Sequence, residues 1–574
     1  MAPRKRKCEV HTSQGLILGP DASYHYDMNI CNDFELLRED PKKVSSLGKH
    51  LSKSAVMENH EKVGSQDGAM DTQHEPEGNG GKDCRQKFID SENGSTGHQD
   101  PDPDGDASID PPKSYVEHVK DLSSLAGTII LSEIFQNTLV LMDIAFVGRL
   151  PGKEPLAAAG LATLWFNIWN TSMLGFCSAI DTLLAQSYGA NEKETFAKWT
   201  GTSIVIVFVS TIVISGFIAA CEPAMVLLGQ DPDISRAAGE FSYRLIPGLF
   251  PYYGFKVLVK YLQTQDKIIP GVVIGIIANG FNFLGNWLFI FKLGYGLNGA
   301  PWATTITRFI EFFFIVAYLF IQKSTFKSAG IWPIVSIESM GIKKLRAFGR
   351  LAIPGALSMV AEAWSFEITT VLAGLMGTTE LDAHVVTLSI ATFIYMSFPF
   401  AIGLAASIRT GHLVGGGRWR DAIRSCVVAT TSSILIQALL IAFLVPLRSY
   451  LSDAFVNDEE VASVTEELIL LSSIFMLGDS VQACIGGVLR GLGRQNFVFF
   501  LNVIGFWVLA VPIGALLAFP GNQSVHGLWM GMSIGIYTSA CIGVAILRKI
   551  DWKREVSKAQ TRISLENAIE IESP

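Results

Sequence analysis

The chain has 574 residues, of which 49% are apolar and only 17% are charged, and its formal net charge is −8. Its mean hydropathy is +0.33, although the beginning of the chain is strongly polar, so apolar residues must be concentrated in the remainder. This distribution excludes a string of ordinary soluble domains. The mild negative charge says little about partners, and we expect no nucleic-acid partner.

The first 120 residues are rich in Asp, Glu, Lys, Ser, Gly and Asn and contain no sustained apolar run. A segment of this composition cannot bury enough apolar surface to fold alone, which predicts a disordered tail. The basic cluster at residues 4–7 is followed by no apolar stretch, so it is no secretory signal. We expect the tail to lie in the cytosol.

From residue 122 onward, apolar segments of spanning length follow one another with short interruptions. About 20 residues suffice for a helix to cross the hydrocarbon core, and a bilayer leaves backbone amides no partners except those within a helix. We therefore predict an all-α integral membrane protein with twelve transmembrane helices. Their approximate ranges are 122–148, 156–187, 201–228, 241–265, 269–291, 298–321, 346–376, 384–409, 423–447, 463–490, 496–518 and 525–548.

The connecting loops alternate in charge. Lys and Arg concentrate in 191–200, 256–268, 322–350, 409–424, 490–495 and the C-terminal segment, whereas the other loops are acidic or polar. The positive-inside rule places the basic loops and both termini in the cytosol. The predicted organisation is a tail at 1–120, a six-helix bundle at 121–322, an inter-lobe linker at 323–345, a second bundle at 346–548 and a cytosolic tail at 549–574.

Motifs of catalysis and metal binding are missing from the sequence. The eight cysteines have no paired metal spacing, and we find no nucleophile elbow, no paired-histidine motif and no phosphate loop. We therefore expect no enzyme, no cofactor and no metal site apart from a coupling ion. A receptor or scaffold is disfavoured by twelve spans and by the internal repeat described next.

The two halves of the spanning region repeat. Residues 175–182 (GFCSAIDT) correspond to residues 403–410 (GLAASIRT), an offset of 228, and nearly the same offset aligns 262–264 with 489–491. Because an even number of crossings separates the copies, both halves share one orientation. This predicts a pseudo-twofold axis along the membrane normal, with the solute pathway between the bundles.

Ionisable residues inside spans are costly, by about 3 kcal/mol on insertion scales, and each is a functional candidate. In the second half these are Glu362, Glu367 and Asp479, with Gln482 on the same helical face as Asp479. Glu362 and Glu367 are about 140° apart around a helix, so we favour Glu362 for chemistry and Glu367 for a supporting role. Tyr395 and Trp364 are candidates for contacting a solute or for packing alone, the tryptophan by stacking on a planar cation.

The first half carries its own polar residues. Asp143 and Asp181 lie in the first two spans, and Asn282 and Asn286 lie in the fifth. They form a candidate ion site. The alternatives are that Asp181 is merely solvated near a helix end, and that the asparagines only join helices.

A buried carboxylate can exchange a proton for a cationic solute, because removal from water favours its neutral form while ionisation recruits a cation. When one proton enters for each monovalent cation that leaves, the membrane voltage cancels. The pH difference then drives about tenfold accumulation per unit, since a tenfold ratio costs about 1.4 kcal/mol. These acids therefore predict a proton-coupled antiporter of small organic solutes.

Four segments carry a family resemblance: 146–150 (FVGRL), 178–190 (SAIDTLLAQSYGA), 362–367 (EAWSFE) and 487–491 (GVLRG). Together they resemble the eukaryotic branch of the multidrug and toxin extrusion (MATE) family, and 261–265 and 287–294 look like plant members. The resemblance implies two six-helix bundles around a V-shaped central cavity and cation-coupled export of diverse organic compounds. It also implies that the family's helix-seven glutamate is Glu362 and its helix-ten acid is Asp479.

Three departures keep alternatives open. Ala363 replaces the usual first tryptophan of the helix-seven motif, and Ser389 stands where animal organic-cation members carry a further glutamate. Asp143 with the two asparagines resembles the ion site of bacterial members, so sodium coupling is a second hypothesis. A lipid or oligosaccharide flippase of the same superfamily is a third, although phosphate recognition favours Arg and Lys. We expect a monomer, in either the plasma membrane or a vacuolar-type membrane.

Overall fold

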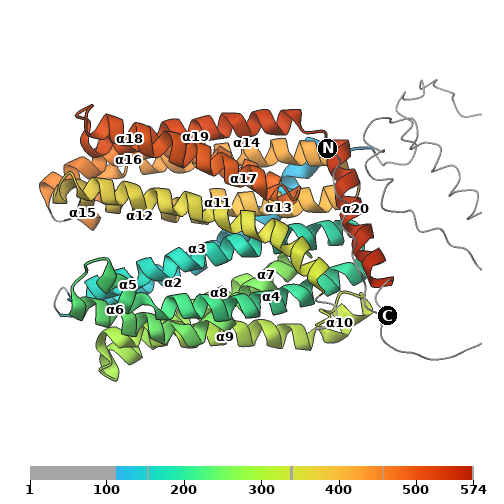
Figure 1. Ribbon diagram of the computed structural model, residues 1–574, viewed down its shortest axis with the longest axis horizontal. Helices are drawn as coiled ribbons and strands as arrows, with labels where there is room; N and C mark the ends of the chain where they lie inside the picture. Colours follow the sequence, from blue (N-terminus) through green and yellow to red (C-terminus); the bar gives the residue numbers. More distant parts are fainter. Residues whose placement is uncertain (1–110, 152–153, 336–340, 457, 572–574) are drawn as a thin grey trace, which may run out of the picture. The chain divides into compact units, whose positions relative to one another are not determined.

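The computed structural model describes residues 111–151, 154–335, 341–456 and 458–571, without the side chains of 565–571. These residues are almost entirely helical (Figure 1). The predicted tail lies outside the described residues except for its last part. There α2 begins at Tyr115, earlier than the predicted first span, because Ser114 and Glu117 form a reciprocal capping box.

The first six predicted spans coincide with helices of the first bundle, here called lobe 1. The third, fourth and fifth of these spans break or change helix type along their length. The elements of lobe 1 are α2 (Tyr115–Val147), α3 (Glu154–Gly189), α4 (Lys193–Ala219), α5 (Cys221–Leu227), α6 (Pro232–Leu245), η2 (Ile246–Gly248), α7 (Leu249–Gln263), α8 (Ile269–Asn286), η3 (Trp287–Lys292), η4 (Gly296–Asn298), α9 (Gly299–Ile321) and α10 (Lys323–Ser328).

The other six spans coincide with helices of the second bundle, lobe 2. Its elements, with the C-terminal helix last, are α11 (Ile342–Gly374), α12 (Thr378–Ser397), α13 (Pro399–Gly415), α14 (Trp419–Leu444), α15 (Arg448–Phe455), α16 (Glu459–Gly491), α17 (Gln495–Asn502), η5 (Val503–Ala510), α18 (Val511–Ala518), α19 (Ser524–Lys549) and α20 (Trp552–Ile571).

Within the described residues, nine helical stretches are long and apolar enough by themselves to cross a membrane. The three remaining predicted spans are α3, the broken pair α6 and α7, and α11. Two of these, α3 and α11, carry buried polar side chains and pack along each other. Their lower hydropathy therefore reflects a position inside the protein, where polar groups find partners.

The two lobes repeat one packing scheme. In each lobe the first helix packs on the fifth (α2 on α8, α11 on α17), and the fourth packs on the sixth (α7 on α9, α16 on α19). The fifth span also contains a π-helical segment in both lobes, η3 and η5. The internal repeat inferred from the sequence is thus visible in the contacts.

The lobes meet through two helices of lobe 1. Helix α2 contacts α12, α13 and α14, while α3 crosses α11 and then runs beside α13. At the first crossing the chains touch glycine to glycine, since a Cβ on Gly175 would lie 2.5 Å from the Gly355 carbonyl oxygen. At the second, a Cβ on Gly189 would lie 2.1 Å from the His412 carbonyl oxygen. Only glycine permits backbones to approach so closely.

Polar contacts between the lobes gather at the end of the helices that α20 crosses, on the right in Figure 1 and here called the terminal end. The Thr182 hydroxyl donates to the Arg490 carbonyl at 2.6 Å, and the Gln186 amide donates to the Gly491 carbonyl at 2.8 Å. At the start of α2, His118 bonds Asp421 at 3.0 Å. This end of the two lobes is closed by direct contacts.

The predicted C-terminal tail contains α20, a feature the sequence reading missed. This helix contacts α13 and α14 of lobe 2 as well as α3 and α4 of lobe 1. Glu555 pairs with Arg494 at 2.6 Å, and Arg562 donates to Gln186 at 2.7 Å. The helix therefore bridges both lobes at the terminal end.

Candidate solute and ion sites

The acid favoured by the sequence, Glu362, lies on the inner face of α11 and meets α17. The Asn502 side-chain amide donates to the Glu362 carboxylate at 3.1 Å and to the Ser358 carbonyl at 2.9 Å. Gln482 of α16 donates to the Asn502 oxygen at 3.2 Å. Two helices, α16 and α17, thus supply a continuous chain of amides to one carboxylate of α11.

Asp479 and Tyr395 complete this cluster. The Tyr395 hydroxyl interacts with the Glu362 carboxylate, and Asp479 lies within electrostatic range of both. Asp479 is only 6% exposed, and among the described residues it forms no ion pair or side-chain hydrogen bond. The structure therefore brings Glu362, Asp479, Tyr395 and Gln482 together, as the sequence predicted.

Two other residues proposed for this site point elsewhere. Glu367 is exposed and makes no hydrogen bond or ion pair within the described part of the chain. Trp364 is 44% exposed and shares a stripe of α11 with Leu357 and Val371. Neither faces Glu362, because residues two and five positions further along a helix are turned well away from it. The tryptophan that does reach this region is Trp507, which donates to the Ala361 carbonyl at 2.7 Å.

In lobe 1, Asp143 near the end of α2 accepts three hydrogen bonds. Asn286 donates at 2.7 Å, Asn282 donates at 3.1 Å, and the hydroxyl of Thr304 bonds the second carboxylate oxygen. The side-chain oxygen of Asn286 is buried without a donor in the described residues. The predicted trio thus converges, and Thr304 of α9 joins it.

The inclusion of Asp181 in that ion site is wrong. Asp181 is 4% exposed and both its oxygens lie 2.6 Å from the Lys260 amine of α7. It lies toward the terminal end of α3, whereas Asp143 lies toward the other end of α2. The predicted span 241–265 and the predicted loop 256–268 overlap, and both include Lys260. In the structure α7 continues to Gln263, so Lys260 lies in a helix, where its amine meets the buried Asp181.

A second polar cluster in lobe 1 escaped the sequence reading. Glu311 of α9 is 1% exposed and accepts from the Gln136 amide at 2.6 Å. Lys256 of α7 lies within electrostatic range of Glu311 and Glu133. Arg308 stands over the rings of Phe166 and Tyr252 at 4.9 and 4.7 Å. The signal that was available is a lysine, an arginine and a glutamate within segments otherwise long enough to span.

Asn502 and Thr304 also escaped the sequence reading. Asn502 carries the only side-chain amide in the apolar run 497–508, and it occupies the same helix of lobe 2 that carries Asn282 and Asn286 in lobe 1. In each lobe, therefore, an acid of the first helix meets an asparagine of the fifth. The repeat could have revealed this correspondence.

Comparison with known protein families matches the two halves of this chain separately. The sequence profile of the MatE family matches twice, at residues 128–288 and 354–516. Multidrug and toxin extrusion protein 2 of Mus musculus is 31% identical over 451 residues, covering 78% of each chain. The same-named protein of Oryctolagus cuniculus is 29% identical, covering 79% of this chain and 75% of its own.

Among solved structures, the eukaryotic MATE transporter AtDTX14 matches with a TM-score of 0.73 and 27% identity, over 78% of this chain and 99% of its own. A mutant of the Vibrio cholerae MATE transporter VcmN is 17% identical with a TM-score of 0.70, over 76% of this chain and 99% of its own, and shows the shared fold. The plant-like part of the sequence resemblance is not borne out, since the curated relatives named above are animal proteins. With both halves matched and the twelve-helix fold shared, the chain belongs to the MATE family of multi-pass membrane transporters.

Proposed function

We propose that the chain is a secondary active antiporter that exports small organic solutes in exchange for protons. The observation that carries the proposal is the cluster of Glu362 and Asp479 inside lobe 2. Two carboxylates lie close together there, and neither forms an ion pair among the described residues. Keeping two carboxylates ionised and buried within a membrane protein is costly. Binding either a proton or a cationic group lowers this cost.

The surrounding groups favour exchange between these two occupants. Asn502 and Tyr395 bond Glu362 without carrying a compensating charge. The Arg490 guanidinium lies within electrostatic range of Glu362 but forms no ion pair with it among the described residues, so the carboxylate can still take up a cation. The side-chain oxygen of Gln482 is buried without a donor in the described part of the chain, and it is an acceptor that a solute N–H or a water can use. Protonation from outside then releases the solute, and ionisation toward the cytosol prepares the site again.

The relatives support the export of drugs and toxins by their names, multidrug and toxin extrusion proteins 1 and 2. The clustering of basic residues in alternate loops supports cytosolic termini. With the termini in the cytosol, the contacts between the lobes at the terminal end close the cytosolic side of the pathway. We further propose a monomer in the plasma membrane or a vacuolar-type membrane, with the bilayer and the solute as its partners and no cofactor beyond the coupling ion.

Sodium is the second candidate for the coupling ion, and the site around Asp143 favours it. A carboxylate, two side-chain amides and a hydroxyl meet there, and the oxygens of such groups are the ligand type that hard cations prefer. In the structure the two amide nitrogens and the hydroxyl donate to Asp143. The buried Asn286 oxygen, which has no donor among the described residues, is the specific observation, since a bound cation would satisfy it.

The test is transport by the purified protein in sealed vesicles, with a proton gradient or a sodium gradient imposed separately. Proton-driven uptake of a fluorescent organic cation is expected to collapse in Glu362→Gln and in Asp479→Asn, because each variant removes a proton carrier. Glu367→Gln is the matched control on the same helix and is expected to transport normally. Full proton-driven uptake in Glu362→Gln would overturn the proposal. Uptake driven only by a sodium gradient would instead indicate sodium coupling, with the site around Asp143 as the coupling site.

A further inference from the structure

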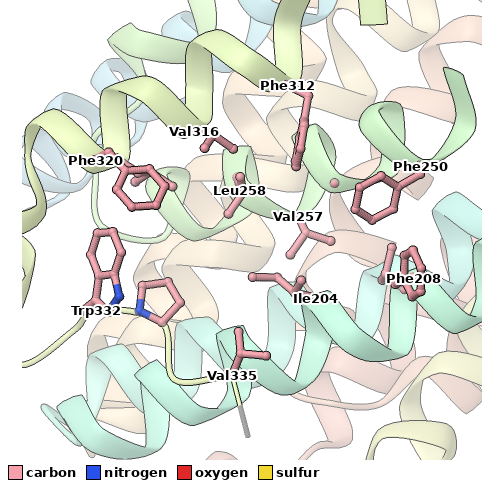
Figure 2. Close-up of a pocket in the computed structure, with 14 residues that line it drawn as sticks. Ile204, Phe208, Phe250, Val257, Leu258, Phe312, Val316, Phe320, Trp332 and Val335 are labelled. Carbon is pink, nitrogen blue, oxygen red and sulfur yellow. The ribbon is translucent and has the colours of Figure 1, made fainter. Parts of the chain in front are cut away.

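An apolar groove runs along the flank of lobe 1, between α4 and α9 with α7 as its floor (Figure 2). Its volume is about 240 Å³. Among the described residues that line it, only Trp332 carries a hydrogen-bonding side chain, and none is charged. The lining includes Phe208 of α4, Leu258 of α7, and Val316 and Phe320 of α9, together with Trp332.

The groove opens sideways, toward the hydrocarbon. Phe208 and Phe320 are 44% and 58% exposed, and both α4 and α9 are long and apolar enough to span a membrane. Apart from the Trp332 indole, a polar solute would find no side-chain partner on these walls. The wall chemistry and the position within the spans therefore select an aliphatic chain of a lipid as the occupant.

One end of the groove is closed by the segment that leads from lobe 1 toward lobe 2. The Tyr261 hydroxyl donates to the Ile331 carbonyl at 2.8 Å, and the Ile334 amide donates to the Ala197 carbonyl at 3.1 Å. These bonds hold Trp332 against Phe320, with ring centroids 5.8 Å apart. Figure 2 shows the two rings side by side at this end.

A cation stands at the same end. The Lys323 amine lies over the Phe320 and Trp332 rings at 5.5 and 5.6 Å, immediately after α9 ends at Ile321. It forms no ion pair with a carboxylate in the described residues. A lysine at the edge of the spans, beside an apolar groove, complements a lipid phosphate.

We propose that this groove binds one acyl chain of an anionic phospholipid whose phosphate is held by Lys323. The lipid would fill the groove and pack against Trp332, and would thereby help to hold residues 331–335 against lobe 1. An uncharged lipid would fill the same walls but leave the lysine without its counter-ion. The groove is separate from Glu362 and Asp479, so the test of lipid binding does not depend on the proposed transport activity.

The experiment measures lipid binding to the delipidated full-length protein by native mass spectrometry. Phosphatidylglycerol and phosphatidylcholine with identical chains are compared. We expect the anionic lipid to bind about fivefold more tightly, the ratio that corresponds to about 1 kcal/mol for one lysine near the surface. Lys323→Gln should abolish this preference and Lys323→Arg should keep it, while Lys327→Gln, an exposed lysine of the same short helix, should leave it unchanged.

A second pair of variants tests whether the acyl chain of the lipid lies in the groove. Val316→Phe fills the groove and is expected to lower the binding of both lipids at least fivefold, whereas Ile212→Phe on the exposed face of α4 should not. Thermal unfolding of each variant confirms that it is folded. Equal binding of the two lipids in the parent, or no response to Lys323→Gln and Val316→Phe in folded protein, would show annular lipid only and overturn the proposal.

Discussion

Replacing Gly355 with alanine tests how the two lobes are held together. The added Cβ would lie 2.5 Å from the Gly175 carbonyl oxygen and 2.3 Å from the Ser178 hydroxyl oxygen. Side-chain carbons essentially never come within 3.0 Å of other atoms. The serine hydroxyl can rotate away, but the carbonyl belongs to the α3 backbone, so α3 and α11 must separate.

The cost follows from overpacking, which is typically about 1–3 kcal/mol. Because α3 and α11 belong to different lobes, this cost falls on the state in which the lobes touch at the terminal end. A shift of about 1–3 kcal/mol changes the ratio of two conformations by about 5- to 150-fold. We therefore expect Gly355→Ala to favour opening at the terminal end.

Hydrogen exchange of the amides at 411–418 and in α20 reports this opening, since both segments pack at the terminal end. In Gly355→Ala these amides should exchange at least fivefold faster than in the parent. Gly127→Ala is the matched control, because its Cβ would meet nothing within 4 Å. Unchanged exchange in folded Gly355→Ala would refute the view that this crossing holds the lobes together.

Two further predictions concern ion pairs. Lys260→Met should destabilise the protein by about 3–5 kcal/mol, because it leaves Asp181 buried without its cation, and the double variant with Asp181→Asn should recover most of the loss in thermal unfolding; an unaffected single variant would contradict this. In α20, burial alone would raise the pKa of Glu555, but hydrogen bonds and charges, led by Arg494, outweigh burial and hold the pKa below 4.5. The docking of α20 should therefore be complete above about pH 4.5 and weaken as the pH falls through the lowered pKa of Glu555. Limited proteolysis at neutral pH should show release of α20 in Arg494→Ala but not in the exposed control Arg554→Ala. Equal protection of α20 in both variants would contradict the prediction.

The sequence predicted those features that depend on composition and on spacing along one helix. Apolar length located all twelve spans, and the cost of burying an acid pointed to Glu362 and Asp479. The repeated glycine at 175 and 403 lies at a close helix crossing in both lobes, where a Cβ on Gly403 would lie 2.6 Å from the Ala483 carbonyl oxygen. Its partners differ, since Gly175 meets the other lobe and Gly403 meets α16 of its own.

Features that depend on pairing between distant helices could not be predicted in this way. Nothing local indicates that Asn502 donates to Glu362, or that Lys260 neutralises Asp181. Residues 256–263 of the predicted loop lie in α7, in agreement with the overlapping span 241–265. Lys260 is tolerated inside this helix because it pairs with the buried Asp181. The helix α20 was missed because its stability comes from docking on both lobes, and its polar composition resembles that of a tail.

Proton release on solute binding tests the central claim most directly. When an organic cation is added to the purified protein in weakly buffered solution, a pH indicator should report protons released in proportion to the cation bound, and Glu362→Gln combined with Asp479→Asn should release none. Binding of the cation without proton release in the parent, or the same release from the double variant, would contradict the account.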